Sequence, residues 1–266
     1  MRGERVALVP TMGALHAGHL ALVTEAKRHA ERVLVSIFVN PIQFGPNEDF
    51  SRYPRPLARD LDLLRSVGAD AVWLPTVVEM YPAGFATNIH VAGVSEGLCG
   101  GTRPGHFDGV ATVVAKLLLQ TTPDVAIFGE KDYQQLCVIK RLVSDLNINT
   151  NILGASIVRD VDGLALSSRN QYLTEDERKT APKLYALLQK FGARIVETSS
   201  LQREGLAAIL GTAKAELLAA GFARVEYLEL RAEDSLAPLA HYAPPSRLLI
   251  AVWLGTTRLI DNLRIG

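Results

Sequence analysis

The chain of 266 residues has little cysteine, few aromatic residues and no excess of charge of either sign. Cys99 and Cys137 are the only cysteines, too few for a disulfide framework or a four-ligand zinc site, and we expect both to be buried thiols. Lysine and arginine total 28, as do aspartate and glutamate, so the formal net charge is zero. No overall basic field attracts nucleic acid, and no polybasic run points to a membrane surface.

The sequence also lacks a long hydrophobic run. The apolar stretch Val33–Val39 has the length of a strand and is interrupted by Ser36, whereas a membrane-spanning helix needs about 20 apolar residues. Near the N-terminus, Pro10 and two histidines break any apolar core that a secretory signal would need. We therefore expect a cytoplasmic protein that binds neither membrane nor nucleic acid.

Strands and helices alternate along the first part of the chain. The order favours a parallel sheet wrapped by helices, with ligands at the carboxyl ends of the strands. The expected strands are Val6–Val9, Val33–Val39, Ala71–Leu74, Val125–Phe128 and Ile152–Val158, and the expected helices after the first turn are Pro56–Val67, Gly109–Leu119 and Tyr133–Leu146.

The pattern changes after Arg159. Two long helical segments, Asp176–Glu197 and Gln202–Ala220, are separated by the polar stretch TSSLQREG, which we expect to be a solvated loop. Strand-like runs follow at Val225–Leu230, Arg247–Leu254 and Arg258–Asn262. The fold class that we expect is α/β: a Rossmann-like domain over residues 1–158 and a smaller α+β domain over residues 159–266.

The stretch PTMGALHAGH, Pro10–His19, lies between the first strand and a helix expected over Leu20–Glu31. The N-terminus of a helix attracts anions through its first backbone N–H groups and its dipole. His16 and His19 are spaced to share one face, and Gly18 lets a ligand approach the backbone. The local pattern predicts a nucleotide phosphate site.

Other interpretations of the histidine pair are weaker but not all excluded. A zinc-protease helix needs histidines four residues apart with a glutamate after the first, which this stretch lacks. It also lacks the glycine fingerprint of dinucleotide-binding folds and the lysine of a Walker A loop. A structural or metal-binding pair remains open.

Five segments together resemble one family. HAGH is similar to the histidine signature of the nucleotidylyltransferase superfamily. The other segments narrow the resemblance to the pantothenate synthetases, which are ATP-dependent pantoate–β-alanine ligases. They are FVNPIQFGPNEDFSRYPR (Phe38–Arg55), GGTRPGHFDGVATVVAKL (Gly100–Leu117), FGEKDYQQL (Phe128–Leu136) and GLALSSRNQYL (Gly163–Leu173).

The resemblance implies a two-step reaction. The carboxylate of pantoate attacks the α-phosphorus of ATP to give pantoyl adenylate and pyrophosphate, and the amine of β-alanine then displaces AMP to give pantothenate. It also implies Mg²⁺ beside ATP, a homodimer, and a C-terminal domain that closes over the active site. No residue has to form a covalent intermediate, so catalysis rests on orientation and charge stabilisation.

The resemblance assigns roles to individual residues. The catalytic residues are His16, His19, Lys131 and Arg169, which spread developing negative charge. The hydroxyls of Ser167 and Ser168 suit phosphate oxygens, and Asp132 suits either a ribose hydroxyl or a helix cap. The full ATP-binding set is Met12, Gly13, His16, Gly18, His19, Gly129, Glu130, Lys131, Asp132, Val158, Leu166, Ser167, Ser168 and Arg169.

The amides of Gln43 and Gln135 resemble the pair that holds pantoate in the family, and Asn40 joins them as a residue for pantoate or β-alanine. An amide offers a donor and an acceptor, which suits a substrate with two hydroxyls and a carboxylate. Arg103 and His106 either frame the carboxylate of a substrate or only fix their loop. No protein ligand set for a metal is evident.

Asp60 is the one carboxylate considered for magnesium, with phosphate oxygens and water supplying most of the shell. Two other functions stay open. One is transfer of AMP to a phosphate ester, which needs a cationic acceptor site instead of the two amides. The other is a non-catalytic nucleotide sensor, which has no need of His19, Lys131 and Arg169.

Overall fold

The computed structural model describes residues 3–46, 48–201 and 205–266. The chain forms two compact units. The N-terminal unit comprises Met1–Glu130 and Gln134–Ile157, and the C-terminal unit comprises Val158–Gly266 together with the short segment Lys131–Tyr133. The segment that carries Lys131 therefore belongs to the second unit, although it lies within the first in sequence.

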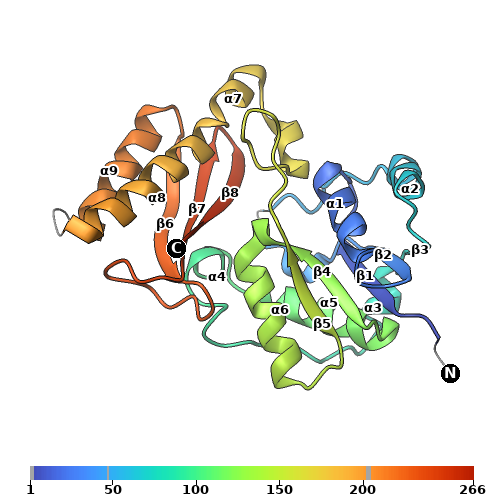
Figure 1. Ribbon diagram of the computed structural model, residues 1–266. Coiled ribbons are helices and arrows are strands. Elements are labelled where there is room, and N and C mark those ends of the chain that lie inside the picture. The colour runs from blue at the N-terminus through green and yellow to red at the C-terminus, as the bar shows by residue number, and fades with distance from the viewer. Residues whose placement is uncertain (1–2, 47, 202–204) are drawn as a thin grey trace. The chain divides into compact units, whose positions relative to one another are not determined.

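The N-terminal unit is built on a five-stranded parallel sheet in the order β3-β2-β1-β4-β5 (Figure 1). This is the α/β architecture expected from the alternation of strands and helices. The strands are β1 (Val6–Thr11), β2 (Arg32–Ile37), β3 (Ala71–Trp73), β4 (Val125–Gly129) and β5 (Asn151–Ala155).

Helices connect these strands and cover the sheet. The buried side chains of alternate strand residues, such as Ala7 and Val9 of β1, pack against Val23 of α1 and Leu64 of α2 in one cluster. The helical elements of this unit are α1 (Ala17–Ala26), η1 (Pro41–Gln43), α2 (Leu57–Ser66), α3 (Val77–Met80), α4 (Leu98–Thr102), α5 (His106–Thr121), η2 (Glu130–Asp132) and α6 (Tyr133–Asp145), the last two shared with the other unit by residues 131–133.

The strand order reverses direction between β1 and β4. Right-handed crossovers then put α5 and α6 on the face of the sheet opposite α1 and α2, and α5 contacts β1. In such sheets ligands bind at the carboxyl ends of the strands beside the reversal. The turn Met12–His16 follows β1 at this place, and Glu130 follows β4.

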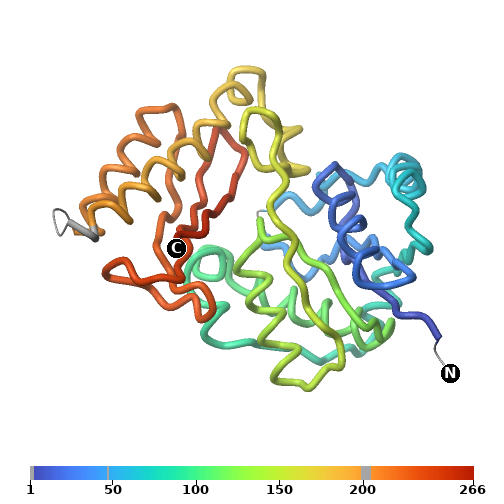
Figure 2. The backbone as a smooth tube through the Cα atoms, viewed as in Figure 1, coloured from blue at the N-terminus to red at the C-terminus, as the bar shows by residue number. Residues whose placement is uncertain are grey.

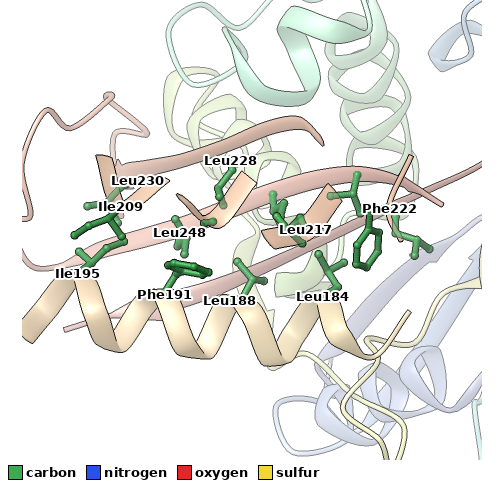
Figure 3. Packing of buried hydrophobic residues seen from close by; sticks show 14 of the residues in the cluster. Leu184, Leu188, Phe191, Ile195, Ile209, Leu217, Phe222, Leu228, Leu230 and Leu248 are labelled. Carbon is green, nitrogen blue, oxygen red and sulfur yellow. The ribbon is translucent and has the colours of Figure 1, made fainter. Parts of the chain in front are cut away.

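The C-terminal unit holds an antiparallel sheet of β6 (Arg224–Ala232), β7 (Ser246–Leu254) and β8 (Thr257–Ile265), with β7 in the centre. Its helical elements are η3 (Ser168–Tyr172), α7 (Glu175–Thr180), α8 (Lys183–Leu201) and α9 (Leu206–Ala219). Helices α8 and α9 run alongside one another (Figure 2). Figure 3 shows one apolar face of α8, including Leu188 and Phe191, packed toward Leu228 and Leu248 of the sheet.

The helix expected over Asp176–Glu197 is in fact two helices. Thr180 ends α7, and α8 begins at Lys183. Pro182 lies between them, and proline inside a helix lacks the N–H of the backbone ladder and clashes with the preceding turn. The stretch TSSLQREG was also assigned wrongly in part, because α8 continues to Leu201; its residues 202–204 lie outside the described part of the chain.

Both cysteines are buried, as expected. Among the helices of the described residues, none combines the length and the apolar character that a membrane crossing requires.

Candidate active site

The turn after β1 is closed by its two histidines. His16 is the N-cap of α1, and its Nδ1 accepts a hydrogen bond from the backbone N–H of Gly18 at 3.1 Å. Nδ1 of His19 accepts from the backbone N–H of His16 at 3.3 Å. The two rings lie 4.1 Å apart between centroids. Helix α1 therefore begins at Ala17, earlier than Leu20, and the histidines supply a reciprocal cap of the kind that Ser and Glu more often form.

These bonds fix the tautomer of each neutral ring. A backbone N–H can only donate, so each Nδ1 is an acceptor and the proton sits on Nε2. Both imidazoles thus carry their N–H on the side away from the cap. Two such donors at a helix N-terminus suit the oxygens of a phosphate.

Asp60 of α2 binds the backbone of the same turn. Its carboxylate is 1 % exposed and accepts from the N–H groups of Ala14 and Leu15, each at 2.8 Å. A Cβ at Gly13 would come within 3.0 Å of Asp60 Oδ2, and Gly13 has a φ of +79°, so the tight approach requires glycine. Both carboxylate oxygens serve the backbone. We therefore expect Asp60 to organise the turn, and whether it also binds magnesium stays a prediction.

A cluster of amides lies at the end of β2. Asn40 is 1 % exposed, and its Nδ2 donates to Gln43 Oε1 at 3.0 Å and to the carbonyl of Gly109 at 3.1 Å. The hydroxyl of Tyr81 donates to Asn40 Oδ1 at 2.7 Å. Gln43 Nε2 lies 3.1 Å from the sulfur of Met12. The structure thus joins Met12, Gln43 and Asn40, three of the predicted residues, and adds Tyr81, which sequence reasoning missed.

Arg103 and His106 lie beside this cluster. His106 Nδ1 bonds the backbone carbonyl of Gln43 at 2.9 Å, and its Nε2 lies 2.9 Å from Arg103 Nη1. Arg103 also donates two hydrogen bonds to the carboxylate of Glu48, at 2.5 and 2.6 Å. Burial acts to raise the pKa of Glu48, but the bonds from Arg103 outweigh it and the pKa lies below its usual value. Of the two roles left open, fixing a loop is the one with visible contacts.

The two neighbouring glutamines of α6 differ in their surroundings. Gln134 is 4 % exposed, accepts from the N–H of Cys99, and donates to the carbonyls of Val94, Glu96 and Gly97. It therefore holds the chain before α4. Gln135, the predicted pantoate residue, is only half-buried on the same helix.

Lys131 is held by the C-terminal unit. Asn262 of β8 donates to its carbonyl at 3.1 Å, and its Nζ lies 3.8 Å from the carboxylate of the exposed Asp132. The next residue, Tyr133, donates to the carbonyl of Glu233 at 3.2 Å, and Arg247 stacks over its ring at 3.7 Å. Gly129 ends β4 and Glu130 opens η2, both in the N-terminal unit.

The predicted phosphate donors lie at the start of η3 and in the loop that leads into it. Val158 and Leu166 pair through a backbone hydrogen bond of 3.0 Å. Arg159, between them in sequence, bonds both oxygens of Asp261 of β8, at 2.6 and 2.8 Å. Ser167 caps η3 by accepting from the N–H of Arg169, and Ser168 and Arg169 lie within η3. Two adjacent residues of β8 thus hold other segments of this unit: Asp261 binds Arg159, and Asn262 binds the backbone of Lys131.

Residues 3–46, 48–201 and 205–266 contain no group of three His, Cys, Asp or Glu side chains arranged to hold a metal ion. Mg²⁺ commonly keeps several waters and binds through substrate phosphates.

Known proteins resemble the chain over nearly its whole length. The family model described as pantoate-beta-alanine ligase matches residues 1–264. The pantothenate synthetase of Rhodospirillum rubrum is 56 % identical over 265 residues, covering 99 % of this chain and 92 % of that protein. The pantothenate synthetase of Chelativorans sp. is 54 % identical over 264 residues, covering 99 % and 91 %.

Solved structures lead to the same family. A pantothenate synthetase from Thermus thermophilus superposes with a TM-score of 0.90 at 48 % identity, covering 99 % of this chain and 94 % of that one. The pantoate-beta-alanine ligase of Francisella tularensis, complexed with beta-gamma ATP and beta-alanine, gives a TM-score of 0.82 at 36 % identity, covering 99 % and 91 %. The chain belongs to the pantoate–β-alanine ligase family, the pantothenate synthetases.

Proposed function

We propose that this chain joins pantoate to β-alanine through a pantoyl adenylate, the reaction of its family, and that the residues described above carry the two steps. A carboxylate oxygen of pantoate forms a bond to the α-phosphorus of ATP, and the bond to the bridging oxygen breaks to release pyrophosphate. The nitrogen of β-alanine then bonds to the activated carbonyl carbon. The bond from that carbon to the AMP oxygen breaks, and the nitrogen loses a proton to solvent.

The capped histidine pair is the observation that carries this proposal. Because Nδ1 of His16 and of His19 is engaged by the backbone, each ring carries its N–H at Nε2. Donors set in advance toward developing charge are the main source of stabilisation in such reactions. The resemblance assigns these donors to ATP, whose phosphates gain negative charge as pyrophosphate leaves.

Lys131 and Arg169 supply the positive charge in this proposal. Lys131 is a point charge for a phosphate oxygen, and the planar guanidinium of Arg169 can bond two oxygens at once. Lys131→Ala and Arg169→Ala should each slow adenylate formation by about 10²–10³-fold, the usual cost of a lost transition-state donor. Single-turnover release of pyrophosphate measures this step. A variant that forms the adenylate at the normal rate would remove that residue from the mechanism.

Pantoate, in this proposal, is held by Gln43 and Gln135, with Asn40 acting behind Gln43. Gln43 Nε2 donates a hydrogen bond to the thioether sulfur of Met12, and sulfur is a weak acceptor. An oxygen of pantoate is a stronger one. ATP, β-alanine and pantoate are thus the substrates, and Mg²⁺ enters on the phosphates of ATP. A cytoplasmic location and a homodimer complete the proposal, and sedimentation of the purified chain tests the latter.

The function itself is tested by identifying the products. The purified chain is mixed with ATP, Mg²⁺, pantoate and β-alanine, and the mixture is analysed by mass. We expect pantothenate and AMP in equal amounts, with no product when pantoate is left out. Formation of ADP, or of an adenylylated phosphate ester when one is supplied instead of pantoate, would contradict the proposal.

A further inference from the structure

We propose that Tyr81 is a positioning residue for pantoate: through Asn40 it sets the amide of Gln43 so that the nitrogen, and not the oxygen, faces the substrate. This inference rests on the proposed function, in which Gln43 contacts pantoate. Tyr81 does not touch the substrate in this account. It acts through two hydrogen bonds in series, from Tyr81 to Asn40 and from Asn40 to Gln43.

The orientation of Asn40 is forced by its surroundings. The carbonyl of Gly109 can only accept, so the atom of Asn40 that lies 3.1 Å from it must be the nitrogen. The oxygen then faces Tyr81, whose hydroxyl donates to it at 2.7 Å. Burial raises the pKa of Tyr81 well above its usual value, so the hydroxyl keeps its proton and remains a donor.

The orientation of Gln43 follows from that of Asn40. The second hydrogen of Asn40 Nδ2 goes to Gln43 at 3.0 Å, so the atom of Gln43 that receives it is the oxygen. Its nitrogen is then turned toward Met12 Sδ at 3.1 Å. An oxygen of pantoate can replace this sulfur as the acceptor. A flipped amide would present an oxygen to the substrate carboxylate and repel it.

The backbone of Gln43 is fixed as well. His106 Nδ1 donates to its carbonyl at 2.9 Å, since a carbonyl can only accept. Gly109 of α5 approaches so closely that a Cβ there would lie 2.8 Å from Gln43 Cα and 2.5 Å from the carbonyl oxygen of Ile42. Because the backbone is held, the Gln43 side chain can change only by rotation about its own bonds. The hydrogen bond from Asn40 prevents the rotation that would exchange the amide oxygen and nitrogen.

Tyr81→Phe removes only the hydroxyl and keeps the ring contacts with Phe38 and Phe85. We expect the KM for pantoate to rise about three- to tenfold, as for one lost hydrogen bond, while the KM for ATP changes less than about twofold. In a Gln43→Ala background, Tyr81→Phe should add nothing, because the residue through which it acts is gone. Steady-state kinetics and calorimetric titration with pantoate measure both effects.

Thr121→Val is the matched control. It removes a hydroxyl that bonds the carbonyl of Leu117, in the same helix as Gly109 but about 18 Å along its axis, and should leave both KM values unchanged. A silent Tyr81→Phe, an equal loss for ATP and pantoate, or a loss that adds to that of Gln43→Ala overturns the positioning role. If Gln43→Ala itself fails to weaken pantoate more than ATP, the assignment of Gln43 in the proposed function falls, and this inference with it.

Discussion

The histidines of the first turn do two things with one ring. Nδ1 of each ring accepts from the backbone of the turn, and the proton of the neutral ring is therefore on Nε2. Cap and donor are therefore coupled: the bond that starts α1 also decides which nitrogen carries the proton in the proposed phosphate site. Asp60 adds to this by holding the N–H groups of Ala14 and Leu15 with a buried carboxylate. The turn between β1 and α1 is thus held by Asp60 at Ala14 and Leu15 and by the histidine cap at the start of the helix.

Two substitutions at His16 separate its cap from its chemistry. His16→Ala should lose both, with unfolding free energy lowered by about 1 kcal/mol and the adenylation rate by about 10²–10³-fold. His16→Asn keeps a good N-cap, so its stability should return to that of the parent while the adenylation rate stays low. Chemical denaturation and single-turnover kinetics measure the two quantities. A His16→Asn variant that retained its rate would show that His16 is structural only.

Asp60→Asn tests the buried carboxylate. The amide nitrogen cannot accept from a backbone N–H, so one buried donor loses its partner, and we expect a cost of about 1–3 kcal/mol in unfolding free energy. The Mg²⁺ concentration for half-maximal activity should not change. Asp62→Asn on the same helix removes an exposed carboxylate paired with Arg65 and should cost less than about 0.5 kcal/mol. If the Asp60→Asn variant needed a different Mg²⁺ concentration for half-maximal activity, Asp60 would be a ligand of the metal after all.

At the scale of elements, the candidate site depends on how closely α5 approaches η1. Gly109 lies against the backbone of Ile42 and Gln43, where no side chain fits. The same helix begins at His106, which bonds the carbonyl of Gln43. One helix therefore holds the short 3₁₀ turn by its backbone in two places. The position of the Gln43 amide therefore depends on this backbone packing as well as on the side-chain hydrogen bond from Asn40.

Gly109→Ala should disturb the site more than its size suggests. The added methyl group forces η1 or α5 to move, at a cost of about 1–3 kcal/mol, and the KM for pantoate should rise more than that for ATP. Gly211→Ala is the matched control, because a Cβ there meets nothing within 4 Å in α9; it should stabilise the chain by about 0.5–1 kcal/mol. Unchanged pantoate kinetics in the Gly109→Ala variant would refute the close packing as a determinant of the site.

Sequence patterns predicted the elements better than their ends or contacts. The strand–helix alternation predicted the parallel sheet, because apolar strand runs and helical periodicity are local features. It missed the break at Pro182, where an apolar helical pattern continues across the interruption. The candidate residues came from motifs. Tyr81 lies outside all of these motifs, and Gln134 lies within FGEKDYQQL but has no role assigned by the resemblance. Only the fold brings Tyr81 to Asn40, 41 residues earlier, so no local signal could have indicated it.

At the scale of the whole molecule, the predicted catalytic residues are divided between two units. His16 and His19 belong to the N-terminal unit, and Lys131 and Arg169 to the C-terminal unit. The sequence boundary near residue 158 did not anticipate that Lys131 is held by β8 through Asn262. In the proposed reaction, all four residues are assigned to the first step, adenylate formation, which precedes the entry of the amine.

Exchange of labelled pyrophosphate into ATP tests this order of events most directly. The purified enzyme is given ATP, Mg²⁺, labelled pyrophosphate and pantoate, with β-alanine left out. Because the adenylate forms and reverts without the amine, label should enter ATP, and omission of pantoate should abolish the exchange. Exchange that strictly required β-alanine, or that proceeded without pantoate, would contradict the two-step account.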